Sequence, residues 1–313
     1  MTPQSSQPTP AQVCMTLSAL AATAAAPRPS GETREQRTWR VAAGIRRQLP
    51  FLWLATRAVW RLEWLALSPD DANMAYIAKS IDGSNRFAVV PRGPIGNITD
   101  ILEDLDVGTV VPFSASGSPT PVAVSKGAMT AFTQVATMVS IPPQAEDEPG
   151  APAPEDAFAS QGTTIVQALA ALVQAAPTTP RPTVYVTGHS LGGCLATMLA
   201  PYLYTQAQSW SDVPDFLLQT FAAPTAGLGS FATYLTGLPF DTRHHFNAWD
   251  AVPLAWTDLG KVKQGKWYPS PGPAGNATPA RCRRLRSHPV HRLHHRPGRR
   301  HDHSHGAGGH RHR

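Results

Sequence analysis

Residues 183–193, with the sequence TVYVTGHSLGG, constrain what this chain can fold into more than any other stretch. The β-branched start of the stretch is typical of a strand, and its glycines are typical of a sharp turn. A helix is predicted after the turn, because apolar residues recur at helical spacing, at Leu195, Met198, Leu199, Tyr202 and Leu203. Gly188 and Gly192 are required, since side chains there would collide with the adjoining strand and helix. Pro201 falls inside the helix and is expected to kink or shorten it.

Ser190 stands at the centre of this turn, in a G-x-S-x-G pattern. A strand before the pattern and an amphipathic helix after it make Ser190 a candidate nucleophile, held in a strained backbone geometry. The Leu191 N–H group is a natural donor to a developing oxyanion, since a helix start has unpaired N–H groups and a positive dipole end. The alternative is a strand-to-helix turn without chemistry. His189 is expected to be a buried or hydrogen-bonded supporting residue and not a general base.

The elements around this turn predict an α/β fold. Residues 74–80 and 86–90 are predicted to be two strands of a hairpin, because Asp82-Gly83 between them is a strong turn signal. A helix is expected at about 162–175, capped by Thr163 or Thr164. Further strands are expected at 216–221 and 243–247. The alternation of helices with buried strands favours a mostly parallel central sheet with helices on both faces.

Composition divides the chain into three regions. Residues 1–40 form an N-terminal segment in which the uncharged stretch 11–26 is expected to be a docking helix, with an unusual export signal as the alternative. Residues 1–10 and 27–38 are expected to be loose connections. Residues 41–268 are expected to form the α/β domain, with an exposed insertion at 142–160. Residues 269–313 are an Arg/His-rich tail, expected to be disordered, with the composition of a GC-rich gene read out of frame.

The formal net charge of +6 comes from this tail and not from the body. Residues 281–313 contain ten Arg, nine His and one acid, so residues 1–280 carry 17 basic and 20 acidic side chains. This slightly acidic body argues against nucleic acid as a partner. The sequence contains no transmembrane candidate, leaves the compartment open and slightly favours the cytoplasm over secretion.

Metal and cofactor sites are not expected. Cys14, Cys194 and Cys282 lie far apart, so they predict neither a disulfide framework nor a zinc site. The tail residues 301–305 (HDHSH) could bind a divalent metal adventitiously, but we interpret the tail as a segment without a selected role.

The sequence GHSLGG at residues 188–193 resembles the nucleophile signature of the class 3 (fungal-type) lipases. Five further segments resemble motifs of that family and occur in the same order. They are residues 87–94 (FAVVPRGP), 97–106 (NITDILEDLD), 124–132 (VSKGAMTAF), 220–227 (TFAAPTAG) and 246–253 (FNAWDAVP). The resemblance covers about residues 74–255.

This resemblance implies the α/β-hydrolase fold and a serine ester hydrolase acting on lipid esters of the acylglycerol type. Ser190 would be the nucleophile that forms an acyl-enzyme, and Asp250 would orient the triad histidine. A lipid or small ester would be the substrate, with transient contact to a lipid surface. Residues 95–123 would supply a mobile lid whose apolar stripe includes Val110 to Phe113, or the same stripe would be ordinary core packing.

Two departures from the family pattern favour another reading. Pro94 stands where the family has a Ser or Thr that donates to the oxyanion, and proline has no N–H, so the Ile95 N–H would have to substitute. The second departure concerns the triad histidine, which in the family follows the aspartate. Every histidine after Asp250 lies in the tail. His244 and His245 come before Asp250 and suit a strand. The alternative is therefore a catalytically impaired lipase-like protein that acts as a lipid- or protein-binding scaffold, without a positioned triad histidine.

Overall fold

The computed structural model describes residues 7–93, 109–118, 120–141, 161–247, 250 and 252–254. Its centre is a six-stranded sheet with the strand order β1-β2-β3-β6-β7-β8. The strands are β1 (Trp60–Leu67), β2 (Met74–Ser80), β3 (Arg86–Arg92), β6 (Thr183–His189), β7 (Asp215–Phe221) and β8 (Asp241–His245). β3, β6, β7 and β8 are parallel, and β1 and β2 add an antiparallel edge. The predicted α/β fold with a mostly parallel sheet is confirmed.

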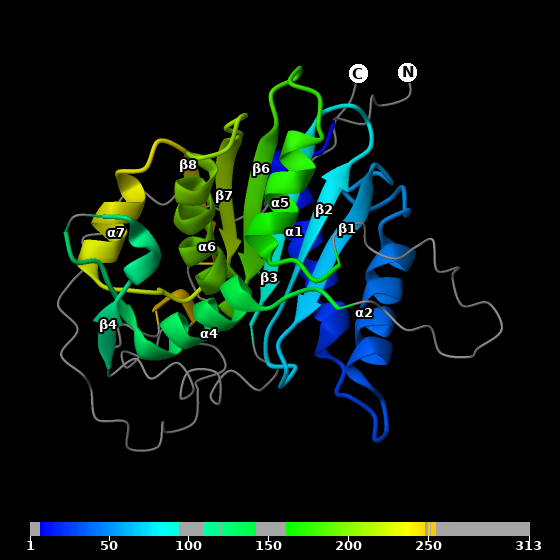
Figure 1. The fold of residues 1–313 in the computed structure, drawn as a ribbon, viewed down its shortest axis with the longest axis horizontal. Coiled ribbons are helices and arrows are strands. Elements are labelled where there is room, and N and C mark those ends of the chain that lie inside the picture. Colours follow the sequence, from blue (N-terminus) through cyan, green and yellow to red (C-terminus); the bar gives the residue numbers. More distant parts are fainter. Residues whose placement is uncertain are drawn as a thin grey trace, which may run out of the picture.

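The predicted hairpin is also confirmed, as the antiparallel pair β2 and β3 with Lys79 opposite Phe87. The side chains of β2 and β3 are buried along nearly their whole length, because helices cover both faces of the sheet. Figure 1 shows α1 (Pro10–Leu20) and α2 (Arg34–Gln48) on one side of the strands, with α4 (Lys126–Thr137), α5 (Ile165–Gln174) and α6 (Leu191–Ala207) on the other. The core therefore has two layers, one on each face of the sheet.

The helix α1 occupies most of the uncharged stretch 11–26 and is followed by the 3₁₀ helix η1 (Ala21–Ala25). Leu17 and Cys14 are fully buried in the layer that α1 shares with the sheet. Two polar contacts add to this packing. The Tyr76 hydroxyl donates to the Leu17 carbonyl at 2.5 Å, and the Ser18 and Thr187 hydroxyls share a buried hydrogen bond of 3.0 Å.

The helix α2 begins earlier than the composition suggested. Residues 27–38 were expected to be a loose connection, but α2 starts at Arg34, so that expectation is wrong for residues 34–38. The expected boundary between residues 40 and 41 consequently falls inside a helix. The physical reason is a capping box, in which Thr33 accepts from the Gln36 N–H and the Gln36 side chain accepts from the Thr33 N–H.

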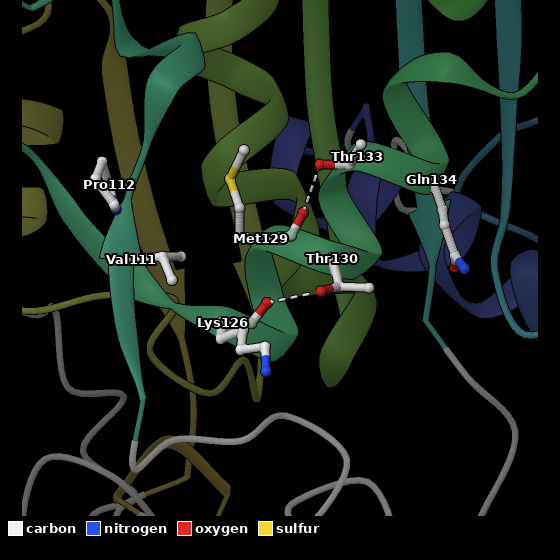
Figure 2. A pocket seen from close by; sticks show the side chains of 7 residues that line it. All are labelled: Val111, Pro112, Lys126, Met129, Thr130, Thr133 and Gln134. Carbon is white, nitrogen blue, oxygen red and sulfur yellow. Dashed lines mark hydrogen bonds between the residues drawn. The ribbon is translucent and has the colours of Figure 1, made fainter.

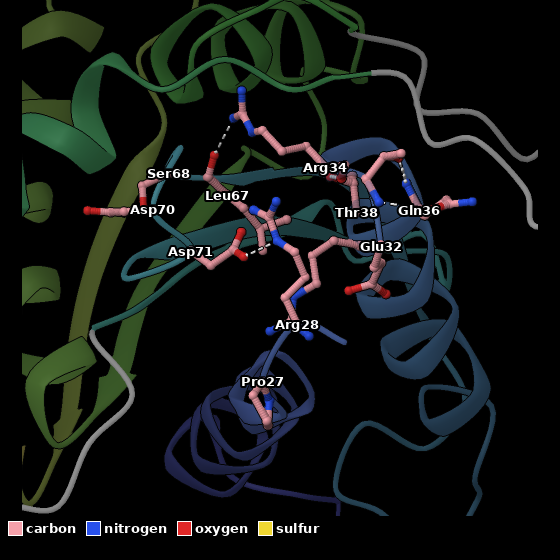
Figure 3. Close-up of polar contacts among 12 residues, drawn as sticks. Pro27, Arg28, Glu32, Arg34, Gln36, Thr38, Leu67, Ser68, Asp70 and Asp71 are labelled. Carbon is pink, nitrogen blue, oxygen red and sulfur yellow. Dashed lines mark hydrogen bonds and ion pairs between the residues drawn. The ribbon is translucent and has the colours of Figure 1, made fainter. Parts of the chain in front are cut away.

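Ion pairs fasten the connection between α1 and α2 to the turn between β1 and β2 (Figure 3). The Arg28 Nε atom lies 2.6 Å from Asp71 Oδ2, and Arg34 donates to the Leu67 carbonyl at 3.2 Å. Arg40 of α2 pairs with Glu32 of the connection, at 2.5 Å. These contacts hold the two N-terminal helices against the sheet edge.

The helices α5 and α6, in the other layer, lie where the sequence predicts them, and α6 differs from the prediction in its length. α5 falls within the predicted range, and Thr164 caps it in a box with Gln167. Of the two expected effects of Pro201, a kink or a shorter helix, the second is wrong, because α6 continues through Pro201 to Ala207. Burial along most of α6 offsets the cost of the proline, which is on the order of 3 kcal/mol in a helix interior.

A smaller two-stranded sheet lies beside α4 and consists of β4 (Val110–Pro112) and β5 (Ala123–Ser125). Phe113, between β4 and the 3₁₀ helix η2 (Ser114–Ser116), is buried among the rings of Phe132, Phe231 and Tyr234. Phe231 and Tyr234 belong to α7 (Gly229–Thr236). The core-packing interpretation is therefore confirmed for Phe113. Val110, in the same stripe, is 45% exposed, so core packing does not extend to it. The apolar residues of the expected lid at 98–107 lie outside the described residues, as do the expected insertion at 142–160 and the tail.

Candidate active site

Ser190 lies between β6 and α6 in an uncommon backbone conformation, with φ 53° and ψ −128°. Such a conformation costs an L-residue roughly 1–3 kcal/mol, so the surroundings must hold it. The Ser190 N–H donates to the Phe221 carbonyl on β7 at 2.9 Å. On the other side, the Ser190 carbonyl accepts from the N–H groups of Gly193 and Cys194, at 2.9 and 3.2 Å. The sheet and the first turn of α6 together impose the strained turn.

The glycines of the motif give the backbone segments room to approach one another. A Cβ atom at Gly188 would lie 2.2 Å from the Gly192 carbonyl oxygen in the first turn of α6. A Cβ atom at Gly192 would lie 2.4 Å from the Pro91 carbonyl oxygen on β3. Real Cβ atoms essentially never come within 3.0 Å of another atom in this way. The prediction that side chains at these positions would collide with the adjoining helix and strand is confirmed.

The first turn of α6 lies directly beside the end of β3. Leu191 is buried, and a Cβ atom at Gly93 would lie 2.5 Å from its Cγ atom. Neither the Leu191 N–H nor the Ser190 hydroxyl has a hydrogen-bond partner among the described residues. Within the described part of the chain, both groups are therefore available at the positive end of the α6 dipole. Pro94 and Ile95 lie outside the described residues, so the role of the Ile95 N–H stays a prediction.

Arg92 fixes the end of β3 just before Gly93. Its guanidinium donates to the Asp71 carbonyl at 3.1 Å, and burial lowers the pKa of Arg92 to about 10. The segment that leads into the expected oxyanion loop thus starts from a well-anchored strand end.

Asp250 lies after β8, at the sheet edge where the parallel strands β6, β7 and β8 all end. Its N–H donates to the Asn247 carbonyl at 2.9 Å, and its Oδ1 atom accepts from the Val252 N–H at 3.0 Å. Val252 begins the short 3₁₀ helix η4 (Val252–Leu254). Asp250 therefore caps local backbone. A carboxylate has about four lone-pair sites, so this contact leaves capacity for an imidazole N–H.

The three histidines within the described residues do not bring an imidazole to Ser190. The His189 side chain is exposed and has no hydrogen bond to another described residue, so the expectation of a buried or hydrogen-bonded histidine is wrong. His189 is the last residue of β6. His244 and His245 lie on β8, as the sequence suggested, and their ring nitrogens contact β7. His244 Nδ1 is 2.7 Å from Thr220 Oγ1, and His245 Nε2 is 2.6 Å from Gln219 Oε1.

The protonation of these two β8 histidines is suppressed in the fold. Burial, with a smaller contribution from His245, lowers the pKa of His244 to about 4. Burial and the nearby Arg243 also lower the pKa of His245, whose ring stacks on Phe221 at 5.0 Å. The nine remaining histidines, His288 to His312, lie outside the described residues.

A hollow of about 400 Å³ opens between β4 and α4, where sequence reasoning placed no site (Figure 2). It is lined by Val111, Pro112, Lys126, Met129, Thr130, Thr133 and Gln134. The Thr130 and Thr133 hydroxyls donate to carbonyls of their own helix, at 3.0 and 2.8 Å, and so are engaged. None of the predicted site residues lines this hollow. No motif in the sequence indicated it, because it forms where β4 packs beside a helix from the next segment.

The described residues show no group of three or more His, Cys, Asp or Glu that could hold a metal ion. Within the same part of the chain, no helix combines the length and the apolar character needed to cross a bilayer.

Comparison with solved structures supports the fold. The M37 lipase superposes with a TM-score of 0.63 at 20% identity, over 82% of this chain and 72% of that one. A lipase from Rhizopus microsporus var. chinensis gives a TM-score of 0.51 at 19% identity, with coverages of 79% and 69%. Lipase II from Rhizopus niveus gives 0.50 at 21% identity, with coverages of 79% and 75%.

The comparison with family profiles is more decisive. No curated protein matches the chain. The profile described as "Lipase (class 3)" matches residues 88–258, which is more than half of the chain and includes the strand–turn–helix around Ser190. The chain belongs to the class 3 lipase family, and by family it is a carboxylic ester hydrolase whose substrates are lipid esters.

Proposed function

We propose that the chain hydrolyses acylglycerol-type lipid esters or smaller esters through an acyl-enzyme on Ser190. The observation that carries this proposal is the strained Ser190 turn at the start of a helix, where no described residue engages the Ser190 hydroxyl or the Leu191 N–H. A serine in this position can attack an ester carbonyl while the adjacent N–H donates to the oxygen that becomes negative.

The reaction uses these groups together with an imidazole, which in the family pattern comes after Asp250 and which only the tail histidines of this chain could supply. The Ser190 oxygen attacks the carbonyl carbon while an imidazole takes the hydroxyl proton, and Asp250 would hold that imidazole as it becomes charged. The same imidazole returns the proton to the departing alcohol. Water then attacks the acyl-enzyme, which releases the fatty acid and restores the serine. The Leu191 N–H is the proposed oxyanion donor, with the Ile95 N–H as a second donor in place of Pro94.

The second candidate is a lipase-like scaffold with impaired catalysis. It is favoured by the engagement of His244 and His245 with β7 and by the position of every histidine after Asp250 in the tail. Without an imidazole, the serine keeps its ordinary acidity and most of the rate is lost.

Labelling with a fluorophosphonate probe separates the two candidates. The full chain, a Ser190→Ala variant and a Ser209→Ala control would be labelled and assayed in parallel with p-nitrophenyl esters and a triacylglycerol emulsion. Ser209 is exposed just after the end of α6, and its hydroxyl donates to the Gln206 carbonyl. Labelling and turnover that vanish only in Ser190→Ala support the hydrolase. A folded wild-type chain without labelling supports the scaffold.

The role of Asp250 has its own test, the Asp250→Asn substitution. Asparagine keeps an oxygen that can accept from the Val252 N–H, so the local backbone should be preserved. If Asp250 orients the triad histidine, ester turnover should fall by roughly 10⁴-fold, as expected when the imidazole takes the wrong tautomer. Turnover within a few fold of wild type would leave Asp250 as a local cap only.

A further inference from the structure

The connection between α2 and β1, residues 50–59, exposes three consecutive large apolar side chains. The exposed fractions are 38% for Phe51, 68% for Leu52 and 77% for Trp53. The rings of Phe51 and Trp53 stack on each other, with centroids 4.3 Å apart and planes inclined by 15°. We call residues 50–59 the aromatic loop. Three adjacent exposed apolar residues form a patch, in contrast to the single exposed residues found on any protein surface.

The aromatic loop has a defined shape. Successive turn hydrogen bonds run from Leu54 N–H to Phe51 O at 3.2 Å and from Arg57 N–H to Leu54 O at 2.9 Å. Leu49 before the patch is buried, and Thr56 after it is fully buried. The loop is thus fastened to the body on both sides of the exposed rings. Binding through these rings would therefore cost little conformational entropy of the loop.

Two exposed arginines flank the patch in the sequence. Of the six arginines in residues 36–62, Arg37 is buried, while Arg40 pairs with Glu32 and Arg61 pairs with Glu63. Arg47, in the last turn of α2, and Arg57, within the loop, are exposed. Neither forms an ion pair with another described residue. The rings are therefore flanked by cations that have no partner within the described fold.

We propose that the aromatic loop, with Arg47 and Arg57, binds the surface of an anionic phospholipid membrane. Tryptophan and phenylalanine favour the boundary between lipid headgroups and acyl chains, and arginines beside them attract anionic headgroups. A protein partner fits less well, because a stable protein interface needs about 20–30 residues on each side. A few aromatic side chains and two cations suit a reversible contact with a bilayer.

The aromatic loop lies at the end of the sheet opposite Ser190. β1 begins at Trp60, which pairs with Ser80, and β2 leads on to Arg86 at the start of β3, opposite Thr183 at the start of β6. Ser190 follows the other end of β6 (Figure 1). The contact therefore anchors the domain by its far end and is separate from delivery of a substrate to Ser190. It does not rest on the proposed hydrolase activity.

Vesicle flotation tests the anchor with the full chain. Vesicles of phosphatidylcholine alone and vesicles containing phosphatidylglycerol would be compared for wild type, Trp53→Ser, Arg47→Gln and Arg57→Gln. We expect binding to the anionic vesicles only, a loss of roughly tenfold or more for Trp53→Ser and a loss of roughly fivefold for each arginine. Val139→Ser, which alters another exposed apolar side chain at 41%, is the matched control and should bind as wild type does. Urea midpoints equal to wild type would show that the variants fold.

A second readout separates the loop from the basic tail, which can also attract anionic lipid. Brominated lipids quench tryptophan in contact with acyl chains, so they should quench the wild type more strongly than Trp53→Phe. Binding without this difference would assign the contact to the tail and overturn the proposal, as would absence of binding. Sedimentation equilibrium tests the remaining possibility, that a second copy of the chain binds the aromatic loop. Self-association that disappears in Trp53→Ser would make the loop an interface between copies of the chain and would also overturn the proposal.

Discussion

Gly192 leaves room for the Pro91 carbonyl oxygen, and Gly188 leaves room for the carbonyl of Gly192, so β3, β6 and α6 approach as backbone against backbone. The Ser190 conformation depends on this approach, since its own N–H reaches the Phe221 carbonyl on the neighbouring strand. The absence of a Cβ atom at Gly188 and Gly192 therefore permits the backbone approach on which the Ser190 conformation depends.

The first prediction concerns Gly192→Ala. The new methyl group would meet the backbone oxygen of Pro91 at 2.4 Å, and a backbone atom within a sheet cannot move away easily. We expect the free energy of unfolding to fall by about 1–3 kcal/mol. Gly237→Ala is the control, because its Cβ atom would meet only ordinary contacts of 3.4 Å or more. Urea unfolding would measure both, and equal stabilities of the two variants would contradict the steric argument.

A second prediction follows from the lowered pKa of His244. The ordinary value of 6.5 applies to the unfolded chain, and the folded value is about 4, so unfolding takes up a proton between these pH values. The free energy of unfolding should therefore fall as the pH drops from 6.5 towards 4, by at most about 3 kcal/mol. His244→Gln removes this titration while keeping a possible partner for Thr220. Urea unfolding across this pH range should show a smaller loss for the variant, and identical pH profiles would argue against the buried neutral imidazole.

At the scale of elements, α1 and α2 form one covering layer of the sheet, although they precede the region matched by the family profile. The contact between Ser18 and Thr187 joins positions 169 residues apart, beside the strand that leads to Ser190. The N-terminal helices therefore support the same strand that positions the candidate nucleophile.

Leu17→Ala tests this contribution of α1. Leu17 is fully buried between α1 and the sheet, so its truncation should lower the free energy of unfolding by about 2–5 kcal/mol. Met15→Ala lies on the same helix with 41% of its side chain exposed and should change stability by less than about 0.5 kcal/mol. Thermal and urea unfolding would compare them. A small effect at Leu17 would mean that α1 contributes little to the fold.

At the scale of the whole molecule, one sheet separates two apolar layers that share its strands. Cys14 lies in the layer of α1, and Cys194 lies in the layer of α6. Burial raises the pKa of each thiol to about 12, so neither should react as a thiolate in the folded chain. The two thiols thus report separately on the two faces of the sheet.

We predict that both thiols become reactive at the same urea concentration. The layers share the sheet strands, so exposing one layer should expose the other. Labelling with a thiol reagent in a Cys282→Ser background, followed by mass spectrometry of the peptides, measures each site. Reactivity of Cys14 at lower urea than Cys194 would show instead that α1 and α2 detach before the rest unfolds.

Local signals in the sequence determined the strand–turn–helix at Ser190, the hairpin of β2 and β3, a cap at Thr163 or Thr164 and the need for Gly188 and Gly192. These features depend on turn chemistry, periodicity and capping within a few neighbouring residues, which a single sequence displays directly. The capping box at Thr33 was also a local signal, but the composition of residues 27–38 suggested a loose connection instead. Assignments of Ser190, Asp250 and the oxyanion donors to catalytic roles stay predictions that the experiments above address.

Only the tertiary structure decided the features that depend on residues far apart in the chain. The exposure of His189, the burial of Phe113 among rings of α4 and α7 and the persistence of α6 through Pro201 all depend on the tertiary surroundings of these residues. The placement of β3 beside β6 likewise brings Gly93 against Leu191. Burial and strand pairing are non-local, because the same local sequence is stable in several conformations until its partners are in place.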